Sequence, residues 1–168
     1  MFELKNYQKS ALAALDRFFR KLKASDLPTA WQSCAPKHEK NGQTWQAKYD
    51  DGALGHVPAV CVRIPTGGGK TFLAAHAVAQ IGKTFRESAA PVVLWLVPSD
   101  AIRSQTLTGL TSPRNPCREA LTEHFGERVR VCALDDLATV GPQEIGQSAI
   151  VIVATIQSFN VKDKTIRT

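Results

Sequence analysis

Apolar residues recur at helical spacing near the start of the chain. Tyr7, Ala11, Leu15, Phe18 and Leu22 follow one another at intervals of four, four, three and four residues. These intervals place the five side chains on one stripe of an amphipathic helix. The pattern predicts a helix from residue 7 to residue 23 with Tyr7 in its core. Basic residues crowd its C-terminal half, where the helix dipole favours positive charge.

Residues 25–56 break every regular period. Prolines and glycines interrupt the stretch, and its aromatic residues are scattered among polar ones. We predict an irregular insertion here, since loops of this length are usually functional or disordered. The expected organisation is an N-terminal helix over residues 1–24, the insertion over 25–56 and a main domain over 57–168.

From residue 57 onward, short apolar runs alternate with helical patterns. Continuous β-branched runs are typical of parallel strands covered on both faces, and their alternation with helices indicates a doubly wound sheet. The predicted fold class is therefore α/β, a mainly parallel sheet between two layers of helices. The predicted strands span residues 59–64, 92–97, 129–134 and 149–154, and the predicted helices span 70–81, 100–110 and 118–125.

Composition agrees with one ordinary globular domain. Of the 168 residues 43% are hydrophobic and 21% charged, and no apolar run approaches the roughly 20 residues that cross a bilayer. Without a signal-like apolar core near the N-terminus, we expect a cytoplasmic protein with no membrane partner. The net charge of +6 favours an anionic partner. The four cysteines form no CxxC pair, so we expect reduced thiols, two of them buried, and no metal held by cysteine.

The most specific string is the segment from Ile64 to Thr71, with sequence IPTGGGKT. It lies between a predicted strand and a predicted helix, as a P-loop does. Three glycines let backbone N–H groups turn toward a phosphate, and the helix N-terminus adds its partial positive charge. Lys70 is expected to reach the β- and γ-phosphates of ATP and the Thr71 hydroxyl to bind Mg²⁺. The predicted loop residues are Thr66, Gly67, Gly68, Gly69, Lys70 and Thr71.

The loop resembles motif I of superfamily 2 DEAD/DEAH-box helicases and translocases, whose usual form is PTGxGKT. The general P-loop pattern asks for glycine where Ile64 stands, whereas this family's form does not. The segment LKNYQ, which ends at Tyr7 and Gln8, is similar to the LRxYQ start of the type III and type I restriction-enzyme branch. In that family a glutamine upstream of the loop reads adenine, and a carboxamide can both donate and accept hydrogen bonds. The resemblance implies that Tyr7 and Gln8 contact the nucleotide.

Two further segments resemble helicase motifs that lie along a nucleic acid. PSDAIRSQ, from Pro98 to Gln105, keeps the spacing of motif Ia, although an ordinary helix capped by Ser99 explains it about as well. TIQSF, from Thr155 to Phe159, is similar to an element of the restriction-subunit branch. Polar groups at such strand ends can hold backbone phosphates without reading bases. The candidate nucleic-acid contacts are Pro98, Ser99, Arg103, Gln105, Thr155, Gln157 and Ser158.

The sequence has one acidic pair that follows an apolar run and could supply catalytic carboxylates. A P-loop ATPase needs one carboxylate at a strand end to hold Mg²⁺ and another to orient water. Asp135 and Asp136 follow an apolar run, but Arg130 interrupts that run and the family places its acidic motif after the TIQSF element. We predict that the two aspartates open a helical turn. The resemblance then implies that the chain is the N-terminal part of a RecA-like motor domain 1.

These observations favour the ATP-binding part of a nucleic-acid-dependent ATPase, a helicase or translocase that resembles the helicase subunit of restriction enzymes. The resemblance implies ATP and Mg²⁺ as cofactors, DNA more than RNA as partner, and an attached methylation or nuclease subunit or domain. Two alternatives stay open. One is a kinase for a small molecule or nucleotide, with its acceptor pocket between residues 100 and 148, and the other is a non-catalytic nucleic-acid-binding module.

Overall fold

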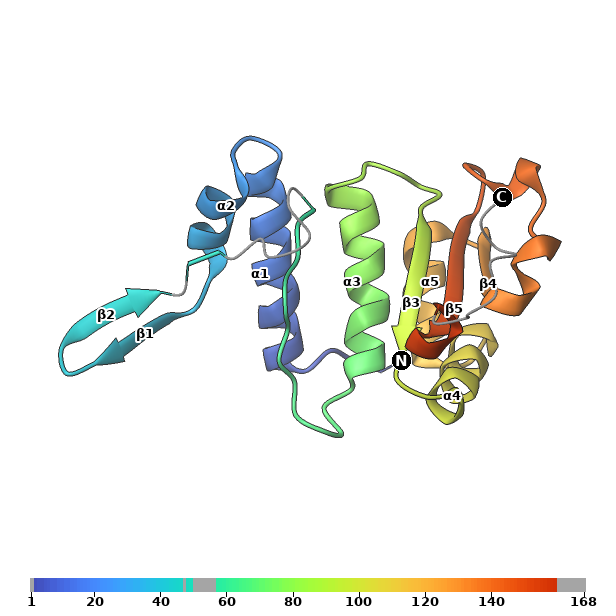
Figure 1. Cartoon of the computed structure of the whole chain (residues 1–168), viewed down its shortest axis with the longest axis horizontal. Coiled ribbons are helices and arrows are strands. Elements are labelled where there is room, and N and C mark those ends of the chain that lie inside the picture. Colours follow the sequence, from blue (N-terminus) through green and yellow to red (C-terminus); the bar gives the residue numbers. More distant parts are fainter. Residues whose placement is uncertain (1, 47, 50–56, 160–168) are drawn as a thin grey trace. The chain divides into compact units, whose positions relative to one another are not determined.

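The computed structural model describes residues 2–46, 48, 49 and 57–159 (Figure 1). Backbone contacts divide the chain into two compact units, with the boundary between Glu87 and Ser88. The first unit holds the predicted phosphate loop, and the second holds both predicted nucleic-acid segments. Each unit is treated by itself below.

Three helices form the first unit: α1 (Asn6–Leu22), α2 (Leu27–Cys34) and α3 (Lys70–Thr84). Helix α2 begins at a cap, since the Asp26 carboxylate accepts from the Thr29 N–H at 2.8 Å and Pro28 suits the first helical turn. Helix α1 contacts both α2 and α3. The shared core contains Leu12, Leu15, Phe18, Phe19, Ala30 and Leu73.

The apolar stripe of α1 is broader than the sequence pattern predicts, and it excludes Tyr7. Tyr7 is 41% exposed, so its prediction as a core residue is wrong, whereas its neighbour Gln8 is only 4% exposed. The reason is that α1 packs against two helices at once, which requires a wide apolar face. Phe19 lies outside the predicted stripe and is buried in that face.

The predicted irregular insertion contains regular structure. Helix α2 occupies residues 27–34, and strands β1 (Lys37–Lys40) and β2 (Gln43–Gln46) pair as an antiparallel hairpin. Its two-residue turn, Asn41 and Gly42, has φ angles of 54° and 72°, the left-handed values that a tight hairpin turn requires. Trp31 and Tyr49 pack on Phe18 of the helical core. The Asn-Gly pair was the sequence signal for this hairpin.

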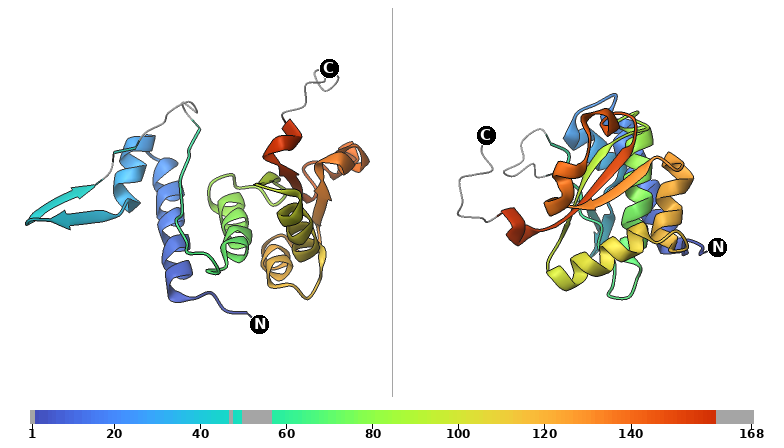
Figure 2. Two further views of the ribbon diagram at one scale, coloured as in Figure 1. Left: turned by 60° about the horizontal axis from the view of Figure 1, so that its bottom comes forward. Right: turned by 90° about the vertical axis from the view of Figure 1, so that its right-hand side faces the viewer.

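The strand predicted for residues 59–64 does not form in the described part of the chain. The segment instead runs alongside α1 (Figure 2), where Val60 and Ile64 pack against the helical core. Cys61 and Arg63 are exposed. Val60 and Ile64 are therefore partly buried against helices without a sheet, whereas Val62 between them is 39% exposed.

The second unit is an α/β structure around a three-stranded parallel sheet with strand order β3-β5-β4. Its strands are β3 (Val92–Val97), β4 (Val129–Ala133) and β5 (Ala149–Thr155), which confirms three of the predicted strands. Helices α4 (Asp100–Thr111) and α5 (Pro116–Phe125) pack against the sheet. The aspartates 135 and 136 open a 3-10 helix, Leu134–Thr139, as predicted.

Burial differs between the strands because only β5 has a neighbour on each side. Every residue of β5 is buried, as a continuous apolar run predicts. At the edge strand β3, in contrast, Val92, Leu94 and Leu96 are about half exposed, so the prediction that both faces are covered fails there. Leu110 of α4 and Leu121 of α5 are completely buried and complete the core of this unit.

The four cysteines all lie in the described residues. All four cysteines are free thiols, but only Cys132 is buried, and Cys61 lies exposed in the segment that forms no strand. Burial raises the pKa of the Cys132 and Cys117 thiols, which lowers their reactivity.

None of the helices in the described residues has the length and apolar character needed to cross a membrane.

Candidate phosphate-binding site and strand-end surface

The phosphate loop is a tight turn that only glycine allows. The Gly68 N–H donates to the Pro65 carbonyl at 3.0 Å, and Gly67 and Gly69 have φ angles of 75° and 71°, which L side chains rarely adopt. A Cβ atom added at Gly68 would lie 2.5 Å from Ile64 Cγ2 and 2.9 Å from the Pro65 carbonyl oxygen. Ile64 therefore fills the space beneath the loop.

Two side chains of α1 hold the loop by one carbonyl. The Tyr7 hydroxyl donates to the Gly68 carbonyl oxygen at 2.9 Å, and Gln8 Nε2 donates to the same oxygen at 3.0 Å. A trans peptide unit is planar, with its C=O and the following N–H pointing in opposite directions. Fixing the Gly68 carbonyl toward Tyr7 and Gln8 thus aims the Gly69 N–H away from them.

Gln8 uses both ends of its amide within the protein. While Nε2 donates to Gly68, Oε1 accepts from the Lys5 N–H at 2.9 Å. The side chain is buried, so these hydrogen bonds also prevent the loss of stability that unsatisfied buried polar atoms cause. The structure therefore brings Tyr7 and Gln8 to the loop and shows a positioning contact for each. The adenine contact that the resemblance implies for them stays a prediction.

Lys70 and Thr71 open helix α3 directly after the loop. The Leu73 N–H makes the first helical bond, to the Gly69 carbonyl at 2.9 Å, so the N–H groups of residues 70–72 lie in the turn that helical carbonyls do not satisfy. Lys70 Nζ donates to the Pro65 carbonyl at 2.9 Å. Thr66, Gly67, Lys70 and Thr71 are exposed to solvent.

These groups fit a polyphosphate with its magnesium ion. Backbone donors, a helix N-terminus and an ammonium group favour negative charge, and the Thr71 hydroxyl is an oxygen ligand of the kind Mg²⁺ takes alongside phosphates. Within the described residues no three or more His, Cys, Asp or Glu side chains gather as metal ligands. Asp135 instead pairs with Arg103 in the second unit.

In the second unit, the carboxyl ends of β3 and β5 lie side by side, with Val97 in register with Thr155. The Thr155 hydroxyl and the Ser158 hydroxyl are 2.9 Å apart, and the Ser158 N–H donates to Thr155 Oγ1 at 3.3 Å. Gln157 Nε2 donates to the Pro98 carbonyl at 3.5 Å. The two predicted nucleic-acid segments thus form one strand-end surface, where parallel sheets commonly place ligands.

The other candidate residues of the PSDAIRSQ segment differ in exposure and in charge. Ser99 caps α4 and accepts from the Ile102 N–H at 3.4 Å, and Gln105 is exposed on the same helix. Arg103 contacts two carboxylates, Asp100 at 3.0 Å and Asp135 at 3.2 Å. Two carboxylates therefore offset its charge locally, while its contact with phosphate stays a prediction. Sequence reasoning missed both aspartates as its partners.

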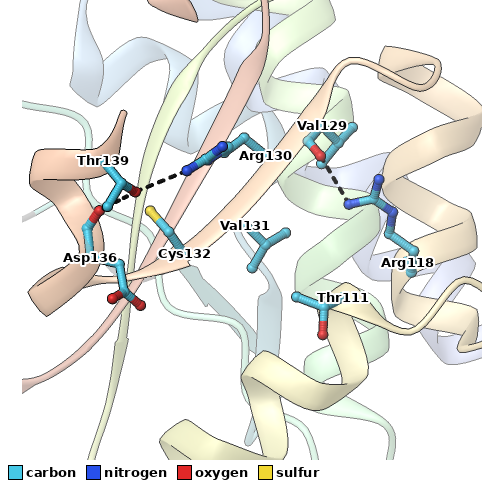
Figure 3. A pocket seen from close by; sticks show the side chains of 8 residues that line it. All are labelled: Thr111, Arg118, Val129, Arg130, Val131, Cys132, Asp136 and Thr139. Atoms are coloured by element: carbon cyan, nitrogen blue, oxygen red, sulfur yellow. Dashed lines mark hydrogen bonds between the residues drawn. The ribbon is translucent and has the colours of Figure 1, made fainter. Parts of the chain in front are cut away.

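A hollow of about 440 Å³ follows the outer edge of β4 (Figure 3). Two arginines border it, but Arg118 donates to the Val129 carbonyl at 3.0 Å and Arg130 donates to Thr139 at 2.9 Å. Arg130 also lies 3.7 Å from the Glu144 carboxylate. The Arg118 contact occupies a backbone carbonyl at a sheet edge that would otherwise invite strand pairing, and the Arg130 contacts are with side chains of the following 3-10 turns. The hollow therefore has a structural explanation.

Comparison with known proteins gives one match. The family model described as type III restriction enzyme, res subunit, matches residues 1–168. Searches of the curated proteins and of the solved structures find no match.

Proposed function

Because the chain belongs to the type III restriction enzyme res-subunit family of superfamily 2, we propose that it binds ATP with Mg²⁺ at residues 66–71 and a nucleic-acid strand at the strand-end surface. Members of this family carry a helicase-like ATP-binding domain with a RecA-like P-loop fold. DNA is the proposed strand, and a methylation or nuclease subunit is the proposed partner of the intact machine.

One observation carries the nucleotide proposal: Tyr7 and Gln8 hold the Gly68 carbonyl and thereby orient the loop N–H groups. The backbone N–H groups at the start of α3, the Lys70 ammonium group and the Thr71 hydroxyl all lie within three residues of Gly68. In this proposal Lys70 contacts the β- and γ-phosphates and the Thr71 hydroxyl ligates Mg²⁺. When bound, ATP would supply the phosphoryl group whose hydrolysis drives the family's motors.

The same proposal predicts slow hydrolysis of ATP by residues 1–168. Hydrolysis needs a carboxylate that holds Mg²⁺ and another that orients water, whereas the aspartates of the described 3-10 turn belong to an arginine contact and a turn. We therefore expect nucleotide binding with very slow turnover from these residues alone.

The strand contact rests on exposed polar groups at adjacent strand ends. Ser99, Gln105 and Gln157 are exposed there, and amide or hydroxyl groups of this kind bind phosphates without reading bases. Thr155 and Ser158 support the turn from within through their mutual contact. DNA would accordingly bind with little sequence preference.

Lys70→Ala tests the nucleotide proposal. The substitution removes the ammonium group from the loop, so we expect ATP with Mg²⁺ to bind at least about tenfold more weakly in titration calorimetry, in line with a loss of about 1.4 kcal/mol or more. Lys83→Ala is the matched control, because Lys83 lies in the last turn of the same helix. Equal ATP affinity in the two variants, with unchanged circular dichroism, rejects the assignment of the loop.

A further inference from the structure

The hairpin β1–β2, residues 37–46, contains a strand, β1, that buries none of its residues. All four residues of β1 are exposed, and because side chains alternate between faces, both faces of this strand meet solvent. An isolated two-stranded ribbon is at best marginally stable in water, and no residue of β1 is buried to stabilise it. We call it the 37–46 ribbon.

The ribbon is nevertheless fastened at its base. Gln46 Nε2 donates to the carbonyl oxygens of Gln32, at 3.1 Å, and Ala35, at 2.6 Å. These carbonyls belong to the end of α2 and the residue that follows it. At the other end, the Asn41-Gly42 turn fixes the register of the two strands. The ribbon therefore extends from the helical core with a defined geometry.

Its charge is predominantly positive. Lys37, Lys40 and Lys48 are exposed, against the single carboxylate of Glu39 between residues 37 and 48. Lys37 and Lys40 are three residues apart and so lie on opposite faces of β1. Each face of the strand thus carries an ammonium group, and the uncharged Gln43 and Thr44 side chains opposite add exposed hydrogen-bonding groups.

We propose that the 37–46 ribbon binds duplex nucleic acid, with Lys37 and Lys40 contacting backbone phosphates. A two-stranded ribbon is of the size that the major groove of B-DNA admits, and lysines on both faces suit a groove with phosphates along both of its sides. The inference rests on the proposed function only in taking nucleic acid as the partner. It adds a duplex contact separate from the strand-end surface.

The test measures binding of the full chain to a fluorescein-labelled 20-base-pair duplex by anisotropy over a series of salt concentrations. The variant is Lys37→Gln with Lys40→Gln, and the control is Lys21→Gln with Lys83→Gln, two exposed lysines of α1 and α3. Both proteins lose the same net charge. Each phosphate contact contributes about 0.9 to the slope of log affinity against log salt, so we expect the ribbon variant's slope to fall by about 1.8 and the control's to change little.

Equal slopes and affinities for the two variants would overturn the proposal and leave the lysines as groups that keep strand edges from pairing. If the double variant loses its circular dichroism signal, Lys40→Gln alone decides, with an expected slope change of about 0.9. A parallel measurement with a single strand separates the two proposals. Single-strand binding without duplex binding contradicts the ribbon proposal alone, whereas the absence of both contradicts the proposed function as well.

Discussion

At the residue scale, the phosphate loop depends on close contacts beneath it. The string IPTGGGKT predicted which residues form the loop, because glycine content and the lysine-threonine pair are local signals. It did not predict that Ile64 touches the loop or that Gln8 would be buried against it. The Gln8 contact joins residues 60 apart in the sequence, and even for the nearby Ile64 a local pattern does not say which apolar or polar side chain fills a given space.

Gly68→Ala tests the close packing of the loop. The added methyl group meets Ile64 Cγ2 and the Pro65 carbonyl oxygen, and the second is backbone that cannot move aside. We expect the free energy of unfolding to fall by about 1–3 kcal/mol and ATP binding to weaken, measured by urea denaturation and calorimetry. Gly109→Ala is the control, since its new Cβ finds only ordinary contacts in helix α4 and helices favour alanine. Full stability and full ATP affinity in Gly68→Ala would contradict the loop geometry.

At the element scale, the sequence predicted a helix or strand well where the residue pattern within that segment alone specifies its secondary structure. Helix α1, helices α3 to α5 and strands β3 to β5 follow their patterns within a few residues. The segment 59–64 was predicted wrongly because an apolar run indicates burial without saying whether a sheet or a helix layer supplies it. The hairpin was missed because β1 contains no apolar residue and β2 contains only Trp45, too few for a strand pattern, although its Asn-Gly turn was visible.

The cap of α2 gives a prediction about pH. Hydrogen bonds from the Thr29 hydroxyl and N–H lower the pKa of Asp26. Stability from this cap is therefore fully present above the ordinary pKa of an aspartate and is lost as pH falls through the lowered value of the folded protein. Asn caps a helix about as well as Asp but does not titrate. We expect Asp26→Asn to lose less stability than the native chain below about pH 4.

Thermal unfolding of the two proteins between neutral and acidic pH measures the difference. Asp16, whose pKa is lowered chiefly by its hydrogen bond with Arg20, titrates in both proteins and cancels from the comparison. Parallel stability curves for the native chain and Asp26→Asn across the acidic range would show that Asp26 does not act as a charged cap.

At the scale of the whole molecule, an excess of positive charge accompanies polar strand ends. The sequence predicted both the net charge of +6 and the two polar segments, and the second unit places these segments together because β3 and β5 are adjacent parallel strands. Adjacency of strands is a property of topology. The expected fold class predicted parallel strands but not their order, and the pairing of Arg103 with Asp135 likewise depends on a turn geometry that the sequence does not specify.

Single-stranded DNA should bind weakly to the full chain and lose affinity as salt rises. Each phosphate contact with a single strand contributes about 0.7 to the salt slope, so a negative slope in anisotropy measurements reports backbone contacts. Gln157→Ala removes an exposed amide of the strand-end surface and should weaken single-strand binding. Gln143→Ala is the control, since it lies in the 3-10 turn Pro142–Glu144, whose Glu144 contacts Arg130 in the first half of β4. Affinity that does not depend on salt would count against a backbone contact.

The Gly68 carbonyl has a consequence for which anions the loop prefers. A carbonyl oxygen has two lone pairs, and two donors from the start of the chain already occupy them. The loop is thus shaped in advance, so in the proposed site we expect an anion that matches this shape to bind without the entropic cost of ordering the backbone. An anion of another size would have to break these two hydrogen bonds, which join residues 60 and 61 apart in the sequence, or lose some of the amide donors. We therefore expect residues 7 and 8 to make the proposed site selective for anions of one size.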